Sequence, residues 1–316
     1  MKNILITGGS GFLGRQIVYF AKEMGYNVFA PRSYEFNLET NEGIDNYFNK
    51  LKNSNNNIDC IIHSAAYYGG IGINQTDPAG LITRNTKMTV NIFKSAAKWN
   101  VKKLISVGSA CSYPGNITDK LYERDMFNGR CHDSVEAYGS YKRTHLVFQK
   151  AYYKQYGIKA NQLVLASLYG EHDVFNDKRS HVIAALIKKV VEAKQNNSAV
   201  YAWGTGKPKR EFIYVKDVAK IIVKAIEFEH DLEPTNVNGE EISIFNLANL
   251  IANIVGLGKG KVEWDSAKPD GAARKVLNGD KLKKLVPDFK RVALKDGLRK
   301  TIEWYIANKQ EADARE

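Results

Sequence analysis

Residues 2–14 read KNILITGGSGFLG, a short apolar segment that runs directly into a glycine-rich turn. The apolar residues 2–6 predict a strand, and residues 15–24, after the turn, predict a helix. A strand, a glycine turn and a helix in this order are typical of a phosphate-binding turn. Gly8 permits the tight turn, Gly11 lets the backbone approach a pyrophosphate, and Gly14 lets the helix pack close to the strand.

We therefore predict that a dinucleotide binds at this turn, with its pyrophosphate facing the backbone at Phe12 and Leu13, where the helix begins. The glycine spacing fits equally well when Gly9 replaces Gly8 as the first glycine. A glycine turn without a ligand is the alternative interpretation. Its position at the start of a strand–helix unit argues for the binding site.

Residues 27–166 alternate between short apolar segments, which predict strands, and longer segments with helical spacing of apolar residues. Strands are predicted at residues 27–30, 59–63, 101–107 and 159–166, and helices at residues 41–57, 78–100 and 136–156. Such alternation predicts an α/β fold with a Rossmann-type, doubly wound parallel sheet. A flexible loop suited to covering a substrate is predicted at residues 67–73, and a polar loop is predicted at residues 116–135.

Beyond residue 170 the alternation loosens into short strands and helices, which predicts a smaller C-terminal substrate-binding region. We expect a dinucleotide-binding domain at residues 1–170, a mainly substrate-binding region at 171–308, and a polar, frayed tail at 309–316. Segments such as residues 211–229 are candidates to return to the first domain.

The end of the second strand indicates which dinucleotide binds. NAD enzymes usually place an acidic residue there to accept from the ribose 2′-hydroxyl, whereas this chain has Arg32 and no acid directly after the strand. Arg32 favours a 2′-phosphate and therefore NADP(H), unless its side chain merely points into solvent. Asn37 and Leu38 follow within reach of the adenine. Ala65 and Ala66, after the third strand, leave room for the cofactor backbone.

A second group of residues carries the chemistry. Tyr138 and Lys142 are one helical turn apart, so both side chains leave the same face of the predicted helix. An ammonium beside a phenol lowers the pKa of the phenol, which can then exchange a proton with a carbonyl oxygen. Ser109 could hold that oxygen, and Cys111 could take a proton from carbon. A solvated helix face is the alternative for the Tyr–Lys pair.

Composition restricts the class of protein. The chain has 316 residues and a net charge of +12, but its Lys and Arg residues are spread along it without a nucleic-acid-binding motif. A solvated basic surface that also serves anionic small ligands explains the charge. Three Cys without paired spacing argue against a disulfide framework or a zinc site, so no metal is expected. No apolar run could cross a membrane, and we expect a cytoplasmic protein.

Two further candidate groups have structural explanations that we prefer. His63 ends the third predicted strand and could be catalytic, although a histidine in that place is more often packed in the core. Cys131 and His132 could form a second acid/base pair, but a place on the loop surface is the preferred interpretation.

The chain resembles the extended short-chain dehydrogenase/reductase family, and within it the GDP-L-fucose synthase group. The similarity extends over nearly the whole chain. The matching stretches are AAYYGGIG at 65–72, GSACSYP at 108–114, YGSYK at 138–142, LYGEHD at 168–173, SHVI at 180–183, WGTGKPKREF at 203–212 and TIEWY at 301–305.

The resemblance implies a role for each matching residue. Tyr138 would protonate the C4 oxygen of a keto-sugar while NADPH delivers hydride to C4. Lys142 would hold the nicotinamide ribose, and Ser109 would bind the C4 oxygen. Cys111 and His181 would form the acid/base pair for C3 and C5, with His181 also beside the cofactor. A small buried cysteine and a helix-end histidine are the alternatives for these two.

The resemblance also implies a binding site for the substrate. The residues expected there are Ser167, Lys189, Trp203, Lys209 and Arg210. The chain departs from the group's pattern near the sugar: Ser167 ends a Leu-Ala-Ser segment in place of Pro-Thr-Asn, Lys189 replaces an Arg, and Ala137 replaces a Pro. The identity of the sugar therefore stays open.

The predicted function is NADPH-dependent C4 reduction of a GDP-4-keto-6-deoxy hexose or heptose, with or without 3,5-epimerisation. A reductase without epimerase activity and a non-enzymatic NADPH-binding regulator are the alternatives. The expected partner is the GDP-linked keto-sugar, with no nucleic acid and no membrane. A homodimer is expected through the helix that carries Tyr138 and the helix before it.

Overall fold

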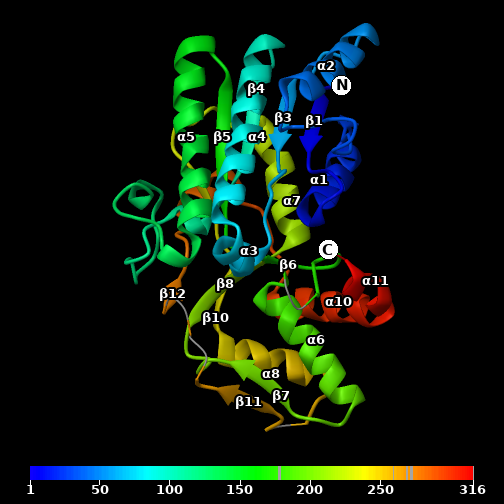
Figure 1. Cartoon of the computed structure of the whole chain (residues 1–316), viewed down its shortest axis with the longest axis vertical. Helices are drawn as coiled ribbons and strands as arrows, with labels where there is room; N and C mark the ends of the chain where they lie inside the picture. Colours follow the sequence, from blue (N-terminus) through cyan, green and yellow to red (C-terminus); the bar gives the residue numbers. More distant parts are fainter. Residues whose placement is uncertain (177–178, 259, 268–269, 271–272, 316) are drawn as a thin grey trace.

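The computed structural model describes residues 1–176, 179–258, 260–267, 270 and 273–315. A parallel sheet of six strands occupies the upper part of the molecule in Figure 1, with the strand order β2-β1-β3-β4-β5-β9. Its strands are β1 (Asn3–Thr7), β2 (Asn27–Phe29), β3 (Cys60–His63), β4 (Lys103–Ser109), β5 (Lys159–Leu165) and β9 (Thr235–Val237). This arrangement confirms the predicted α/β, doubly wound fold.

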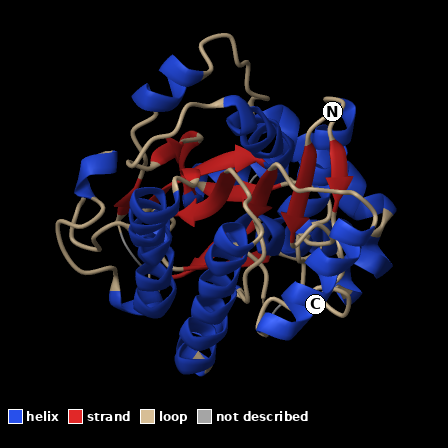
Figure 2. Cartoon of the chain, turned by 90° about the horizontal axis from the view of Figure 1, so that it is seen from above, coloured by secondary structure: helices blue, strands red, loops and turns tan. Residues whose placement is uncertain are grey.

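Helices cover both faces of this sheet, as Figure 2 shows. They are α1 (Phe12–Glu23), α2 (Asn41–Asn53), α4 (Pro78–Lys98), α5 (Glu136–Tyr156) and α7 (Val215–Lys224). Successive side chains of a strand point to opposite faces. Ile4 and Ile6 therefore join the core under α1 and α7, while Leu5 between them joins the core under α2 and α4.

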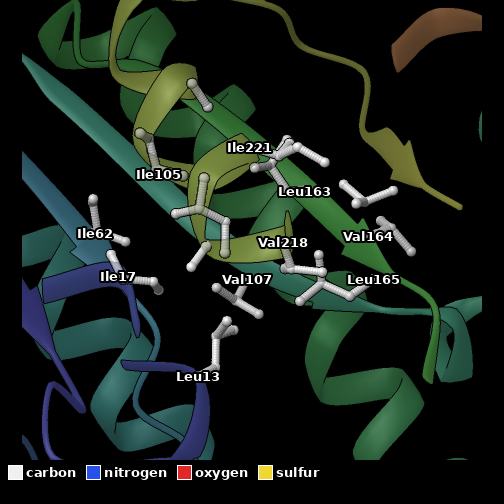
Figure 3. Close-up of a cluster of buried hydrophobic side chains, with 14 of the residues drawn as sticks. Leu13, Ile17, Ile62, Ile105, Val107, Leu163, Val164, Leu165, Val218 and Ile221 are labelled. Atoms are coloured by element: carbon white, nitrogen blue, oxygen red, sulfur yellow. The ribbon is translucent and has the colours of Figure 1, made fainter. Parts of the chain in front are cut away.

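The core under α1 and α7 is drawn in Figure 3, where Leu13 and Ile17 of α1 lie close to Val107 of β4 and to Val218 of α7. Helix α7 comes from a late part of the chain, and so does strand β9. Segments beyond residue 210 therefore complete the parallel sheet and the helices that cover it. Helix α7 lies within residues 211–229, the segment named as a candidate to return to the first domain, whereas β9 lies beyond that segment.

A second region with its own core lies below the sheet in Figure 1. Its larger helices are α6 (Val182–Gln195), α8 (Ile244–Val255) and α10 (Leu294–Ala307). One small sheet contains β6 (Ser167–Tyr169), β8 (Lys209–Tyr214), β10 (Glu240–Ser243) and β12 (Arg274–Lys275). A second pairs β7 (Val200–Trp203) with β11 (Val262–Asp265).

Short helical segments complete the described chain. They are α3 (Gly70–Thr76), η1 (Ala110–Ser112), η2 (Glu123–Asp125), η3 (Asp133–Val135), η4 (Ala225–Glu227), α9 (Asp280–Leu285) and α11 (Lys309–Ala314). Among the described residues, no helix combines the length and the apolar character that crossing a membrane requires.

Two loop predictions were wrong. The stretch predicted as a flexible loop at residues 67–73 runs into helix α3, where the Asn74 amide donates to the Gly70 carbonyl oxygen over 2.9 Å. The tail predicted to fray forms α11, which is fixed by side chains of other elements. The Tyr305 hydroxyl donates to Asp313 over 2.9 Å, and Lys309 pairs with Glu192 at 3.2 Å. The Arg179 guanidinium also donates to the Tyr68 carbonyl over 2.8 Å, so tertiary contacts, which local composition does not reveal, order both segments.

The first turn of α5 packs tightly on η1 at Gly139. A Cβ added there would overlap the carbonyl oxygen of Cys111 and lie 2.8 Å from the sulfur of Cys131. In an exposed helix, replacing Gly by Ala is favourable by roughly 0.5–1 kcal/mol. At this contact the added Cβ would overlap the Cys111 backbone, and this overpacking makes the substitution unfavourable.

We predict that Gly139→Ala lowers the free energy of unfolding by about 1–3 kcal/mol, measured by urea denaturation. Gly258→Ala is the matched control, because a Cβ at Gly258 meets nothing within 4 Å. An unchanged or raised stability of Gly139→Ala would contradict the close contact.

Candidate active site

The glycine turn after β1 is built to accept an anionic group. The Gly11 N–H donates to the Gly8 carbonyl over 2.9 Å, and Gly11 precedes α1 without any side-chain cap, so the amides of the first turn stay open to a ligand. A Cβ on Gly14 would overlap the Gly8 carbonyl. The sequence assigned this close approach to a dinucleotide site, and the geometry fits one.

The loop after β3 lies against the same turn. The Thr7 hydroxyl oxygen accepts from the N–H groups of Ser64 and Ala65, over 3.2 and 3.1 Å. A Cβ on Gly8 would stand 2.9 Å from the Ala65 backbone. Ala66 follows with its side chain exposed. The two predicted alanines therefore border the glycine turn, with no bulky side chain from either in the way of a bound cofactor.

The residues expected at the adenosine of the cofactor lie beyond β2, where the site is more exposed than at the glycine turn. The Arg32 side chain lies in solvent beyond β2, and its backbone N–H donates to Glu35 over 3.0 Å. Asn37 accepts from the Glu39 N–H over 3.0 Å. Leu38 is buried, and its carbonyl accepts from the Asn91 amide over 2.9 Å. The exposed Arg32 guanidinium is thus placed to bind a phosphate. Glu35 is an acidic residue close to Arg32 that the sequence did not indicate.

Tyr138 and Lys142 leave α5 on its buried face. Tyr138 is 8% exposed, and the Lys142 ammonium lies 5.6 Å from the centre of its ring. Lys142 is buried and donates to the carbonyl oxygen of Val107 in β4 over 2.6 Å. Strand β4 and helix α5 therefore fix the pair at the carboxyl edge of the sheet.

The expected depression of the Tyr138 pKa is not found. Burial raises the pKa of Tyr138 well above its usual value, with smaller contributions from Tyr68, Tyr141 and Cys111. Burial also lowers the pKa of Lys142 to about 7. Desolvation of both groups outweighs their mutual attraction. The phenol is consequently a neutral hydrogen-bond donor, the form required to give a proton to an oxygen.

Ser109 and Cys111 follow at the end of β4. The Ser109 hydroxyl oxygen accepts from the Cys111 N–H over 3.2 Å, which shapes the one-turn helix η1. Cys111 is half-buried and packs against the cluster formed by Leu81, Tyr138 and Tyr141. Both predicted residues are therefore at the same edge as the phenol.

His181 reaches this place from the second region, where it precedes α6. Its ring stacks on Tyr68 with 5.8 Å between the ring centres, and Tyr68 in turn packs on Tyr138 at 4.3 Å. The carboxylate of Asp173 lies 3.8 Å from the imidazole Nδ1. Burial lowers the pKa of His181, but Asp173 outweighs it and the pKa is raised overall. A phenol, a thiol and an imidazole thus converge on one site.

The residues expected at the substrate lie on the second region. Ser167 is exposed in β6, and Trp203 is 68% exposed at the end of β7. The Lys189 ammonium donates to the Tyr201 carbonyl over 3.0 Å and lies 5.6 Å from the Trp203 ring centre. Lys209 and Arg210 begin β8.

Sequence reasoning missed two cations beside them. Strand β12 runs parallel to β8 and places Arg274 opposite Lys209 and Lys275 opposite Arg210. Arg210, Arg274 and Lys275 border a cavity of about 170 Å³ together with His132. A two-residue strand has no periodicity, so the adjacent basic pair in the sequence was the only available signal.

His63 is a packed core residue in this structure, as preferred. It is 1% exposed, its Nδ1 lies 2.9 Å from the Thr7 hydroxyl, and burial lowers its pKa to about 3. The surface position preferred for Cys131 was wrong. Cys131 is buried, and its thiol contacts the Ser112 carbonyl oxygen at 3.6 Å. His132 is half-buried, with Nδ1 2.9 Å from the Ser134 hydroxyl.

Comparison with known proteins gives consistent results. A model of the NAD dependent epimerase/dehydratase family matches residues 4–239. A putative GDP-L-fucose synthase 2 of Arabidopsis thaliana is 35% identical over 310 residues, which are 96% of this chain and 92% of that protein.

Solved structures are similar over the same extent. A GDP-L-fucose synthetase from Naegleria fowleri bound to NADP has a TM-score of 0.89 at 26% identity and covers 99% of this chain and 95% of its own. A GDP-6-OMe-4-keto-L-xylo-heptose reductase from C. jejuni has a TM-score of 0.86 at 25% identity, with coverage of 97% and 98%.

We predict that Asp173→Asn lowers the pKa of His181, because the substitution removes the negative charge that favours the imidazolium. A proton NMR titration of the imidazole should therefore give a pKa above 6.5 in the unmodified protein and a lower value in the variant. His181→Gln identifies the resonance among the six histidines. Equal titration curves would show that Asp173 does not act on His181.

Proposed function

The chain belongs to the NAD-dependent epimerase/dehydratase family, and on this premise we propose that it reduces the C4 ketone of a GDP-linked 4-keto-6-deoxy sugar with NADPH. The convergence of Tyr138, Cys111 and His181 beside the glycine turn carries the proposal. The fucose synthase and the heptose reductase among the relatives support a GDP-sugar as the substrate class.

The proposed reduction uses residues of β4 and α5. NADPH supplies a hydride to C4 when it is bound. Ser109 holds the C4 oxygen, and Tyr138 gives that oxygen its proton as the carbonyl becomes a hydroxyl. The buried phenol is protonated for this purpose. Lys142, held by the Val107 carbonyl, positions the nicotinamide ribose and the phenol.

Cys111 and His181 are the proposed pair for epimerisation. The C4 ketone acidifies the hydrogens on C3 and C5, because the carbanion that remains delocalises into an enolate. One group removes a proton from carbon and the other returns one to the opposite face, which inverts the centre. His181 comes from the second region, so a reductase without epimerase activity needs only a different placement of this imidazole.

The adenosine end of the cofactor and the GDP end of the substrate are proposed to bind to different regions of the molecule. NADP(H) is the cofactor, with Arg32 proposed at its 2′-phosphate, and the NADP-bound structure from Naegleria fowleri supports this choice. For the GDP end of the substrate we propose Trp203, Lys209 and Arg210, together with the adjacent Arg274 and Lys275. Lys209, Arg210 and Lys275 on these two paired strands suit a diphosphate. Arg274 is already paired with Glu241 over 2.8 and 2.9 Å.

The homodimer stays a prediction, as do the cytoplasmic location and the domain boundaries. Helices α4 and α5 pack side by side, and each shows exposed apolar residues. These are Ile82 on α4 and Val147, Tyr153 and Tyr156 on α5. The resemblance implies that the dimer forms through this helix pair, and its exposed apolar residues are spread around the helices. The relatives include a hexose enzyme, the fucose synthase, and a heptose reductase, so both a hexose and a heptose fit the proposal.

We predict that the protein oxidises NADPH in the presence of GDP-4-keto-6-deoxy-mannose or a GDP-4-keto-6-deoxy-heptose, and that Tyr138→Phe lowers kcat by at least about 100-fold. The variant keeps the ring but loses the proton donor. Loss of NADPH absorbance and chromatography of the product measure the reaction.

Tyr141→Phe is the matched control, because it removes a neighbouring buried hydroxyl from the same helix and should leave most of the turnover. No turnover of any keto-sugar in the panel by the unmodified enzyme would reject the proposed function. Tight NADPH binding without turnover would favour the non-enzymatic regulator instead. Undiminished turnover in Tyr138→Phe would reject the role of the phenol.

A second prediction concerns the cofactor. Arg32→Gln should raise the KM for NADPH by about tenfold, the effect of losing one charge-assisted contact of roughly 1.4 kcal/mol, while the KM for NADH stays within twofold. Arg299→Gln, at an exposed pair with Asp296, is the control. A parallel change in both KM values would place Arg32 away from the 2′-phosphate.

A further inference from the structure

Tyr68 lies among the three reactive groups of the site, although the sequence assigned it no role. The Tyr68 ring packs on the Tyr138 ring, with 4.3 Å between the ring centres and 34° between the ring planes. The other is His181, whose imidazole stacks on Tyr68 at 5.8 Å and 19°. Tyr68 also joins Cys111 in the packing around Leu81 and Tyr141. The Tyr68 ring therefore packs on the Tyr138 phenol and the His181 imidazole, in the same cluster as the Cys111 thiol.

The backbone of Tyr68 is held in place. Its carbonyl oxygen accepts from the Arg179 guanidinium over 2.8 Å. A Cβ on the next residue, Gly69, would stand 3.1 Å from Nε of the same Arg179. Helix α3 begins directly after this point and packs on α4. The ring is thus presented to the site by an ordered segment tied to the second region.

Epimerisation and reduction need different access to the sugar. Reduction needs the C4 oxygen beside Tyr138 and Ser109. Inversion at C3 or C5 also needs the sugar carbon within reach of an acid and a base on opposite faces. A tyrosine ring that lies between Tyr138 and His181 takes up space through which the imidazole would reach the sugar. A phenol kept neutral by burial does not replace that base.

We propose that Tyr68 is a specificity-determining residue that restricts the approach of His181 to the sugar, so that C4 reduction outpaces proton exchange at C3 and C5. This inference rests on the proposed function. In exchange, a base removes a proton from C3 or C5, the electron pair enters the enolate, and an acid returns a solvent-derived proton to carbon. In reduction, hydride adds to C4 and the Tyr138 proton adds to oxygen, which removes the ketone and ends exchange.

The test measures exchange and reduction separately in deuterated water. Mass spectrometry counts deuterium in the keto-sugar without NADPH, and then in the product when NADPH is present. We expect slow exchange in the unmodified enzyme and deuterium in only a minority of product molecules. Tyr68→Val should exchange at least about tenfold faster, because one side chain is removed from a packed site. Tyr68→Phe should match the unmodified enzyme, because it keeps the ring.

Tyr67→Val is the matched control, because its ring faces Arg84 at 4.1 Å and lies one residue away on the same segment. It should not change the number of deuterium atoms per product. Tyr68→Leu carries the same expectation as Tyr68→Val and is used if that variant unfolds on a thermal melt.

The inference is overturned if the unmodified enzyme incorporates deuterium fully at both C3 and C5. It is also overturned if the folded Val or Leu variant exchanges no faster. Either result with normal NADPH oxidation leaves the proposed function standing and removes only the role of Tyr68. A lack of NADPH oxidation in the unmodified enzyme rejects the proposed function itself.

Discussion

The hydrogen bond from Lys142 to the Val107 carbonyl is the contact on which the site depends. It joins helix α5 to strand β4 over 2.6 Å. These two elements carry Tyr138 and Ser109, and Cys111 follows β4 in η1. An ammonium that is 2% exposed costs free energy unless it is paired, and burial lowers its pKa to about 7. The proposed function places this ammonium beside the nicotinamide ribose, where its charge would be used. A lysine that titrates near neutral pH also means that its charge depends on what binds beside it.

Burial lowers the pKa of each of three histidines, but the partner of each decides whether its pKa is lowered or raised overall. His63 is enclosed with only a threonine hydroxyl at its Nδ1, and its pKa falls to about 3. His145 lies 5.7 Å from His63 between ring centres, and burial holds its pKa well below the ordinary value. His181 has the Asp173 carboxylate and keeps a raised pKa. Among these three, only His181 has a partner of opposite charge and lies beside Tyr68 at the border of the site, which suits the acid/base role proposed for it.

The sequence predicted the parts of the fold whose signals are local. The glycine turn fixed the first strand and helix, the periodic helix at residues 136–156 agrees with α5 at both ends, and the strand that ends at Ser109 lies at the expected edge. The tail helix α11 and the strand β12 escaped prediction, because their order comes from contacts such as Lys309 with Glu192 and β12 with β8. The sign of the Tyr138 pKa shift was also missed. Spacing shows that a lysine is near, but only the enclosed structure shows that desolvation dominates.

The two proposed activities are divided between the two regions of the molecule. Ser109, Tyr138 and Lys142 all lie on β4 or α5, so the packing of this helix on this strand fixes their mutual geometry. His181 enters from the start of α6, and its ring reaches the site through Tyr68. Arg179, two residues before His181, holds the backbone of Tyr68. A small shift of the second region would therefore move the imidazole and the ring together while leaving the reducing groups in place. The proposed reduction and the proposed epimerisation would therefore respond differently to such a shift, because only the second depends on His181.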